Sequence, residues 1–221
     1  MAHVLLLHGL GQSPQSWQEQ VVALPPGWTA SAPRVLGLDL SGDQDLHLDT
    51  AVAHVLAGLD AGGVRRAHVV AIGLGAVVAT RLAARHPERV DRLVLNGGQV
   101  RQSGLAGWLQ GRLLGRMSDQ RMQARGVRRE RVTAVVRAMR DLDLRGDLVR
   151  VVAPTLVVHG RGDRAHRAGA KAVADGIAGA RYVEVEGGER LNTDHPRAFN
   201  EVVLAFLSEP GQSAVPDVAE R

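Results

Sequence analysis

The chain contains no cysteine, which excludes disulfide bonds, thiolate metal ligands and a cysteine nucleophile. Aromatic residues make up only 3% of its 221 residues, and lysine occurs once, at Lys171, among 27 basic residues. Long apolar runs are also absent: the first one, at residues 4–7, is too short for a membrane span or the core of a signal peptide. We therefore expect a cytoplasmic protein.

What the sequence does contain is typical of a single globular domain. Hydrophobic residues make up 45% of the chain, together with 26 glycines, and a chain of this length can bury a full core. We expect one domain over residues 1–208. A flexible tail is expected at residues 209–221, where proline, glycine and scattered charges follow no helical or strand period.

The net charge of +4 conceals an uneven distribution of arginine. Residues 112–150 hold eleven arginines against five acidic residues. Arg121, Arg125 and Arg128 share one helical face by their spacing, so this segment is the candidate surface for an acidic partner. No element that reads nucleic acid accompanies the basic stretch. We therefore expect neither a nucleic-acid nor a membrane partner.

Short β-branched and leucine-rich runs alternate with longer amphipathic segments, which is the pattern of an α/β fold with a mostly parallel, six-stranded sheet flanked by helices. The predicted strands are residues 3–7, 34–38, 67–72, 92–95, 155–159 and 182–185, and the predicted helices are residues 16–24, 48–61, 74–85, 165–177 and 196–207. Over residues 99–150 apolar side chains recur at helical spacing instead. We expect this insert to form a short helical cap at the carboxyl edge of the sheet.

Four motifs resemble those of the α/β-hydrolase superfamily. LLLHGLG at residues 5–11 is similar to its His-Gly oxyanion loop, and VVAIGLGA at residues 69–76 is similar to its strand, elbow and helix. RLAARHPERV at residues 81–90 resembles the turn that follows the elbow helix, and APTLVVHGRGD at residues 153–163 resembles the strand that ends at the catalytic acid. The resemblance implies an α/β-hydrolase fold with a small helical cap.

The resemblance also implies the positions of a catalytic triad, and two of the three members are missing. The nucleophile position holds Gly73, and the histidine position, counted back from the proline that opens the last helix, holds Glu189. The acid is kept as Asp163. The backbone amides of Leu10 and Leu74 are kept as candidate oxyanion donors, because they depend on no particular side chain.

The resemblance places Asp163 and Glu189 at the edge of one pocket, where two carboxylates could perform general acid–base catalysis without a covalent intermediate. Two structural alternatives remain open. Asp163 could cap the helix that follows it. Alternatively, the arginines at positions 161, 164 and 190 could neutralise both carboxylates as structural ion pairs.

Among the histidines, His166 is the best-placed free imidazole, three residues after the acid. His8 and His159 are expected mainly to shape the oxyanion loop and to end a buried strand, with ligand contact as the alternative. A dinucleotide-binding loop would need a glycine where Val78 stands, and no set of metal ligands is apparent. We therefore expect no cofactor and no metal.

The sequence supports one leading function and two alternatives. The leading hypothesis is an α/β-hydrolase-fold protein that lacks serine-hydrolase chemistry and binds a small acyl or carbonyl compound in a retained pocket. It either binds this compound without catalysis or performs non-covalent acid–base catalysis of the lyase, isomerase or cyclase type. The first alternative is a hydrolase in which Asp163, Glu189 and His166 direct a water molecule. The second is a non-enzymatic regulatory or interaction protein.

Overall fold

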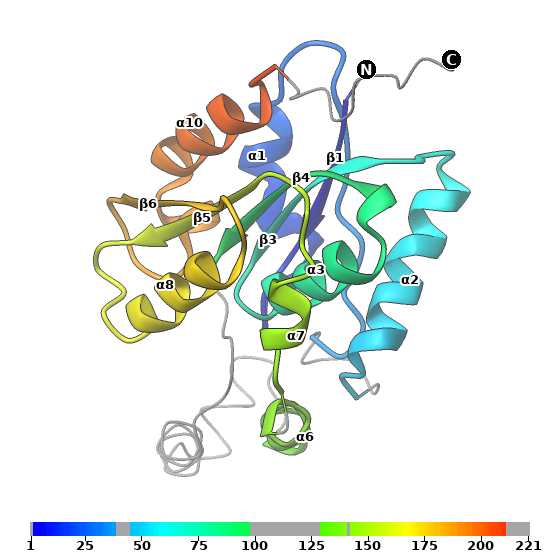
Figure 1. Cartoon of the computed structure of the whole chain (residues 1–221), viewed down its shortest axis with the longest axis vertical. Coiled ribbons are helices and arrows are strands. Elements are labelled where there is room, and N and C mark those ends of the chain that lie inside the picture. Colours follow the sequence, from blue (N-terminus) through cyan, green and yellow to red (C-terminus); the bar gives the residue numbers. More distant parts are fainter. Residues whose placement is uncertain (1, 39–44, 98–128, 141, 211–221) are drawn as a thin grey trace, which may run out of the picture.

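The computed structural model describes residues 2–38, 45–97, 129–140 and 142–210, which form a parallel sheet between two layers of helices (Figure 1). In their order across the sheet, the strands are β2 (Thr29–Ser31), β1 (His3–Leu7), β3 (Ala67–Ile72), β4 (Val90–Asn96), β5 (Thr155–Gly160) and β6 (Arg181–Val185). Every neighbouring pair runs parallel. The carboxyl ends of all six strands therefore lie at one edge, where ligands bind in open α/β sheets.

The connections between the strands are mostly helical. The helices are η1 (Pro14–Trp17), α1 (Gln18–Val22), α2 (Leu48–Ala61), α3 (Leu74–Arg85), η2 (Pro87–Arg89), α6 (Arg129–Arg140), α7 (Arg145–Leu148), α8 (Arg167–Gly176), α9 (Leu191–Asp194) and α10 (Pro196–Leu207). The bounds predicted for α2, α3 and α10 are confirmed, and the predicted first and fourth helices are shorter than expected.

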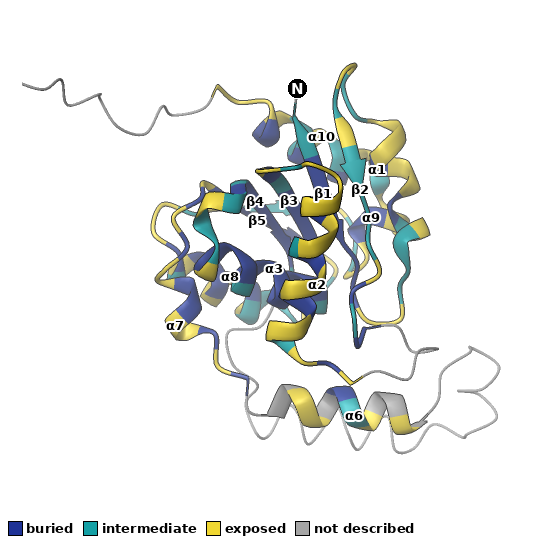
Figure 2. Cartoon of the chain, turned by 90° about the vertical axis from the view of Figure 1, so that its right-hand side faces the viewer, coloured by how far each residue is buried: buried dark blue, intermediate teal, exposed yellow. Residues whose placement is uncertain are grey.

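The sheet has a hydrophobic core on each face, because alternate residues of each central strand point to opposite sides. One core lies under α2, α3, α7 and α8 and includes Leu5 and Leu7 of β1. The other lies under η1, α9 and α10 and includes Val4 and Leu6 of the same strand. Figure 2 shows the central strands as buried between outer helices whose outward faces are exposed. Burial on both faces explains why the sequences of these strands are continuous apolar runs.

One predicted strand is wrong. Residues 34–38 form a turn rather than a strand, and the edge strand lies earlier, at Thr29–Ser31. Gly37 adopts a φ of +81°, in the left-handed region that interrupts an extended strand. The imidazole of His3 hydrogen-bonds the hydroxyls of Thr29 and Ser31 at 2.8 and 2.9 Å, so β2 is joined to β1 through side chains as well as backbone.

The expected cap at residues 99–150 is described only from residue 129 onward. This part comprises α6, whose Val135 is 2% exposed and belongs to the core, and the short helix α7. Arg121, Arg125 and Arg128 lie outside the described residues, as does the tail beyond residue 210. Within the described ranges, no helix is long and apolar enough to cross a membrane.

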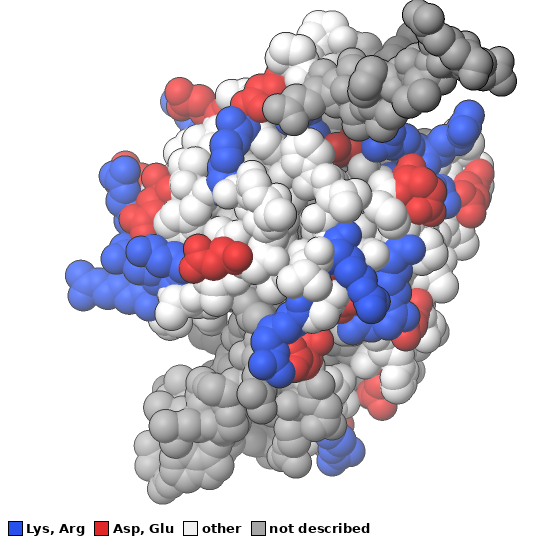
Figure 3. Space-filling view, viewed as in Figure 1, with Lys and Arg blue, Asp and Glu red and all other residues white. Residues whose placement is uncertain are grey.

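Charges of both signs alternate on the face formed by α2, α3 and α8 (Figure 3). Many of the described arginines pair with carboxylates, as in the ion pairs Arg66–Asp91 at 2.9 Å and Arg89–Asp60 at 2.6 Å. This mixed surface contrasts with the excess of arginine in residues 112–150 of the sequence.

Candidate functional site at the carboxyl edge of the sheet

Gly73 is the single residue between β3 and α3, and its backbone has the shape of a nucleophile elbow. Its φ of 56° and ψ of −123° lie where a side chain is strained. Its amide donates to the Asn96 carbonyl at the end of β4, at 2.9 Å. Among the described residues, a Cβ atom added here would meet only the Cα of Gly9, at an ordinary 3.7 Å. This turn therefore combines a strained backbone with space for a side chain within the described part of the chain.

The oxyanion loop begins at the end of β1 and is held in place by His8, which is buried. The His8 Nδ1 donates to the Gly9 carbonyl at 2.9 Å, and its Nε2 accepts from the Val35 amide at 3.1 Å. Because the Gly9 oxygen can only accept and the Val35 amide can only donate, these contacts place the ring proton on Nδ1. His8 therefore shapes the loop, as the sequence predicted.

The peptide group between Gly9 and Leu10 is oriented by these contacts. The Gly9 carbonyl also accepts a hydrogen bond from the backbone N–H of Gln12 at 3.2 Å. Since a trans peptide is planar, fixing this carbonyl directs the Leu10 N–H to the opposite side. Neither that amide nor the Leu74 amide, at the start of α3, has a hydrogen-bond partner within the described segments. Two backbone donors therefore flank the elbow, and the α3 dipole favours negative charge beside them.

A network of side-chain amides around the buried residue Asn192 supports the same loop, and none of its members is among the site residues predicted from the sequence. Gln12 accepts from the Gly9 amide at 3.0 Å through Oε1 and donates to Asn192 Oδ1 at 3.2 Å through Nε2. Asn192, which is fully buried on α9, donates to the Ser16 carbonyl at 3.1 Å. Gln20 binds the Asn192 carbonyl at 3.1 Å. The only sequence signal for this network was Asn192, a polar residue at a helical position that is buried.

Asp163 follows β5 in a tight turn that rests against the loop after β6. The Gly162 amide of this turn donates to the Gly187 carbonyl at 2.8 Å. The Asp163 carboxylate accepts from the His166 amide at 3.2 Å, and both of its oxygens lie 2.9 Å from His166 Nδ1. The predicted helix-capping role is not observed, because α8 begins at Arg167 with His166 as its N-cap and receives no side-chain capping hydrogen bond. Asp163 instead binds the backbone and the imidazole of His166 in the turn that leads into this helix.

Glu189 lies in the loop beside this turn and is exposed. Among the described residues, no hydrogen bond or ion pair joins it to Asp163. The arginine alternative is not observed either: Arg190 pairs with Asp194 at 3.3 Å, and the Asp163 carboxylate is bound by His166. The structure thus brings the two loops together, but it pairs the acid with His166.

Next to the acid turn lies a cluster built from β5, β6 and α8. His159 is completely buried, with Nε2 donating to the Asp163 carbonyl at 2.9 Å and its ring stacked on Tyr182. Burial and a 3.0 Å hydrogen bond to Glu184 raise the pKa of Tyr182 to about 12. The same hydrogen bond lowers the pKa of Glu184. The hydrogen bond from His159 to the Asp163 carbonyl holds the turn that carries Asp163.

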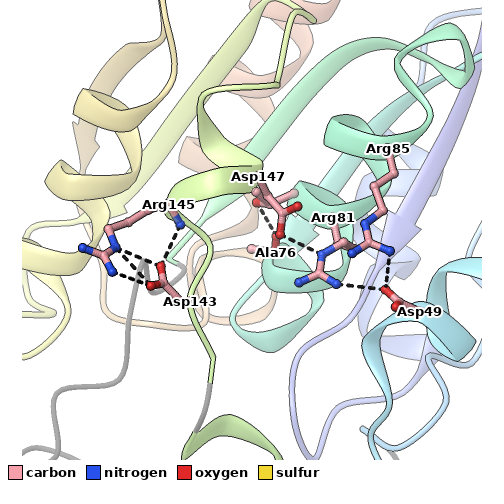
Figure 4. Close-up of polar contacts among 8 residues, drawn as sticks. Asp49, Ala76, Arg81, Arg85, Asp143, Arg145 and Asp147 are labelled. Atoms are coloured by element: carbon pink, nitrogen blue, oxygen red, sulfur yellow. Dashed lines mark hydrogen bonds and ion pairs between the residues drawn. The ribbon is translucent and has the colours of Figure 1, made fainter.

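The elbow helix α3 is tied to its neighbours by Arg81, as Figure 4 shows. Its Nε donates to Asp147 of α7 at 2.7 Å, and its Nη1 donates to Asp49 of α2 at 2.9 Å. Burial alone would lower the pKa of the Arg81 guanidinium, but these two carboxylates outweigh it and raise the pKa. This ion pair anchors the chain where it returns from the expected cap.

Comparison with known proteins agrees with the fold. The sequence profile of the alpha/beta hydrolase fold family matches residues 2–123, which is more than half of the chain. The chain belongs to this family.

Individual relatives have hydrolase names. The chain is similar to the 2-hydroxymuconate semialdehyde hydrolase of Pseudomonas sp. (strain CF600), with 33% identity over 102 residues, 42% of this chain and 35% of that protein. It is 32% identical over 97 residues to the pyrrolizixenacetamide deacetylase of Xenorhabdus hominickii, 42% of this chain and 36% of that protein. These matches thus span about a third of each relative's length. The crystal structure of a hydrolase from Pseudomonas aeruginosa PA01 is similar with a TM-score of 0.79 and 27% identity, covering 94% of this chain and 90% of that one.

Proposed function

We propose that this α/β-hydrolase-fold protein binds a small acyl or carbonyl compound at the elbow and does so without forming an acyl-serine. The ligand oxygen is held by the amides of Leu10 and Leu74. The rest of the carbonyl group lies over Gly73, in the space that a nucleophilic side chain would otherwise fill. Any chemistry that follows is non-covalent acid–base chemistry.

The observation that carries this proposal is the elbow itself. Gly73 has a strained backbone between β3 and α3, and an added Cβ atom has no contact nearer than 3.7 Å among the described residues. The nearest hydroxyl along α3 belongs to Thr80, which is buried and donates to the Ala76 carbonyl at 2.8 Å. It therefore offers no substitute nucleophile, while the two backbone donors need no side chain.

The relatives support the class of ligand. The names of the two similar proteins denote a semialdehyde hydrolase and a deacetylase, and both names refer to carbonyl-containing compounds. Gly73 excludes only the covalent step at this position, because oxyanion binding depends on backbone amides. A carbonyl ligand therefore agrees with both the relatives and the retained donors.

A second candidate function is hydrolysis by a water molecule, and the contact between Asp163 and His166 favours it. A carboxylate on Nδ1 leaves Nε2 of the same ring as the basic atom, which is the arrangement a general base requires. Water would add its oxygen to the carbonyl carbon while His166 Nε2 takes one of its protons. The bond between that carbon and the leaving group would then break, and the leaving group would take the proton from His166. This route forms no bond to the protein.

Binding is tested by titrating ¹⁵N-labelled protein with butyrate and with methyl butyrate while following the backbone amides. We expect the Leu10 and Leu74 resonances to move together. Gly73→Ala should weaken binding, because the new methyl group occupies the space over the elbow. Gly63→Ala is the control for a side chain at a positive φ: Gly63 has a φ of +66°, and a Cβ there meets nothing within 4 Å among the described residues.

The covalent chemistry is tested on the same protein with a fluorophosphonate probe and a short-chain nitrophenyl ester. We expect no labelled serine and no burst of nitrophenol, because the elbow has no nucleophile. Labelling at any serine with matching turnover would contradict the proposal. So would amide shifts confined to residues far from Leu10 and Leu74.

A further inference from the structure

Gly9 lies between a glutamine side chain and the elbow. On one side, its amide donates to Gln12 Oε1 at 3.0 Å. On the other, its Cα lies 3.7 Å from the point where a Cβ of residue 73 would stand. A Cβ added to Gly9 would meet Gln12 Oε1 at 3.3 Å and the Ile72 carbonyl at 3.2 Å, so the loop is packed tightly at this point. A shift of Gln12 would therefore move Gly9 relative to the elbow.

The orientation of the Gln12 amide is fixed at both ends. Oε1 faces a backbone donor, whereas Nε2 faces Asn192 Oδ1, which is an acceptor. Asn192 cannot reverse its own amide without loss, because its Nδ2 donates to the Ser16 carbonyl at 3.1 Å. Asn192 is 0% exposed, so water cannot replace a lost partner cheaply. The two side chains therefore act as a rigid strut between α9 and the oxyanion loop.

We propose that Gln12 and Asn192 are positioning residues that set the Leu10 amide for ligand binding, an inference that rests on the proposed function. Asn192 belongs to α9, the helix directly after the loop in which a triad histidine is expected. The loop before α9 has Glu189 where the histidine is expected. The helix α9 itself contacts the oxyanion loop through the hydrogen bond between Asn192 and Gln12. The role of Asn192 is thus to hold the binding loop rather than to move a proton.

The network also provides its own control for a purely structural role. Gln20 is buried, binds the Asn192 carbonyl at 3.1 Å and Asn200 Oδ1 at 2.8 Å, and does not contact Gly9. Loss of Gln20 weakens the same network without releasing the loop. Loss of Gln12 releases the loop directly. Variants at these two positions therefore separate positioning from stability.

The experiment compares Gln12→Met, Asn192→Ala, Gln20→Met and, as an exposed control, Gln18→Ala. Each ¹⁵N-labelled variant is titrated with butyrate and methyl butyrate, and its melting temperature is measured in parallel. We expect Gln12→Met to weaken binding roughly tenfold, as for the loss of about one buried hydrogen bond. The Leu10 response should shrink while the Leu74 response persists. Asn192→Ala should act in the same direction, and Gln18→Ala should match the wild type.

The outcomes distinguish this inference from the proposed function. If wild-type Leu10 and Leu74 do not respond to either compound, the proposed function fails. If they respond but Gln12→Met binds like Gln18→Ala, the positioning role is refuted. Equal weakening in Gln12→Met and Gln20→Met at equal stability would also refute it, because it would show a structural effect alone. If Gln12→Met does not fold, Gln12→Ala replaces it, and its binding is compared with that of the other variants in the same way.

Discussion

The imidazole Nδ1 of His166 lies 2.9 Å from both carboxylate oxygens of Asp163, only three residues earlier in the chain. In a Ser-His-Asp triad the acid orients a distant histidine. Asp163 instead binds an imidazole that belongs to its own turn. The Asp163 side chain is 9% exposed and that of His166 is 30% exposed, so the carboxylate is the more deeply buried partner.

Asp163→Asn should change the protonation pattern of the His166 ring. The carboxylate favours a proton on Nδ1, whereas an asparagine oxygen or nitrogen can face either form of the ring. We expect ¹⁵N spectra of the histidine rings to show His166 as the Nδ1–H tautomer in the wild type and as a mixture in the variant. The variant should also lose about 1 kcal/mol of stability, because the hydrogen bonds that Asp163 accepts within this turn are weakened. His195→Asn, at an exposed position, is the control; an unchanged His166 spectrum in Asp163→Asn would argue against the pairing.

The ion pair between Arg81 and Asp147 should contribute far more to stability than the one between Arg145 and Asp143. The first pair is mostly buried, with side-chain exposures of 15% and 8%, and the second is exposed, at 66% and 40%. Arg81→Met leaves a buried carboxylate unpaired, which costs about 3 kcal/mol. Arg145→Ala should cost less than about 1 kcal/mol. Urea unfolding of both variants measures the difference, and equal losses would show that burial does not strengthen the first pair.

Tyr182 should ionise near pH 12, and it can be followed alone because the chain has one tyrosine. Tyrosinate absorbance should show this midpoint in the folded protein and one of about 10 in denaturant. Since the folded pKa is raised, the stability linked to Tyr182 is complete below pH 10 and is lost as the pH rises toward 12. Glu184→Gln should lower the folded midpoint, because it removes the carboxylate that accepts from the tyrosine. A folded midpoint near 10 would contradict the described contact.

Gly73→Ser should not create an esterase. The serine side chain fits, because among the described residues a Cβ there meets only Gly9 at 3.7 Å, but the positive φ costs about 1–3 kcal/mol. The position where the resemblance places the triad histidine holds Glu189, so no imidazole is expected there to take the serine proton. Gly63→Ser places a serine at a positive φ away from the site and is the control for the loss of stability. Rapid ester turnover by Gly73→Ser would show that another base reaches the elbow.

Much of the fold could be predicted from the sequence because its signals are local. Apolar runs and helical periods located five of the six strands and the full lengths of α2, α3 and α10. The edge strand was missed because Thr29–Ser31 is only three residues long and pairs on one side, so it has little apolar pattern. The apolar residues Val35 and Leu38, which follow this strand in the sequence, are buried in a turn instead.

The site was predictable only where one residue type decides its geometry. Gly73, His8 and Asp163 stand in recognisable motifs, so their positions at the carboxyl edge follow from the strands that carry them. The partner of Asp163 and the strut from Gln12 to Asn192 depend on side-chain contacts between loops, the latter spanning positions far apart in the sequence. No periodicity encodes such contacts, because each one depends on how two loops meet in space.

The most direct test of the central claim is a crystal structure of the protein with butyrate bound. The account predicts one carboxylate oxygen within about 3 Å of the Leu10 and Leu74 amides, with the carboxyl carbon over Gly73 and no covalent bond to the chain. Butyrate bound covalently, or bound elsewhere with the elbow filled by protein side chains, would contradict it.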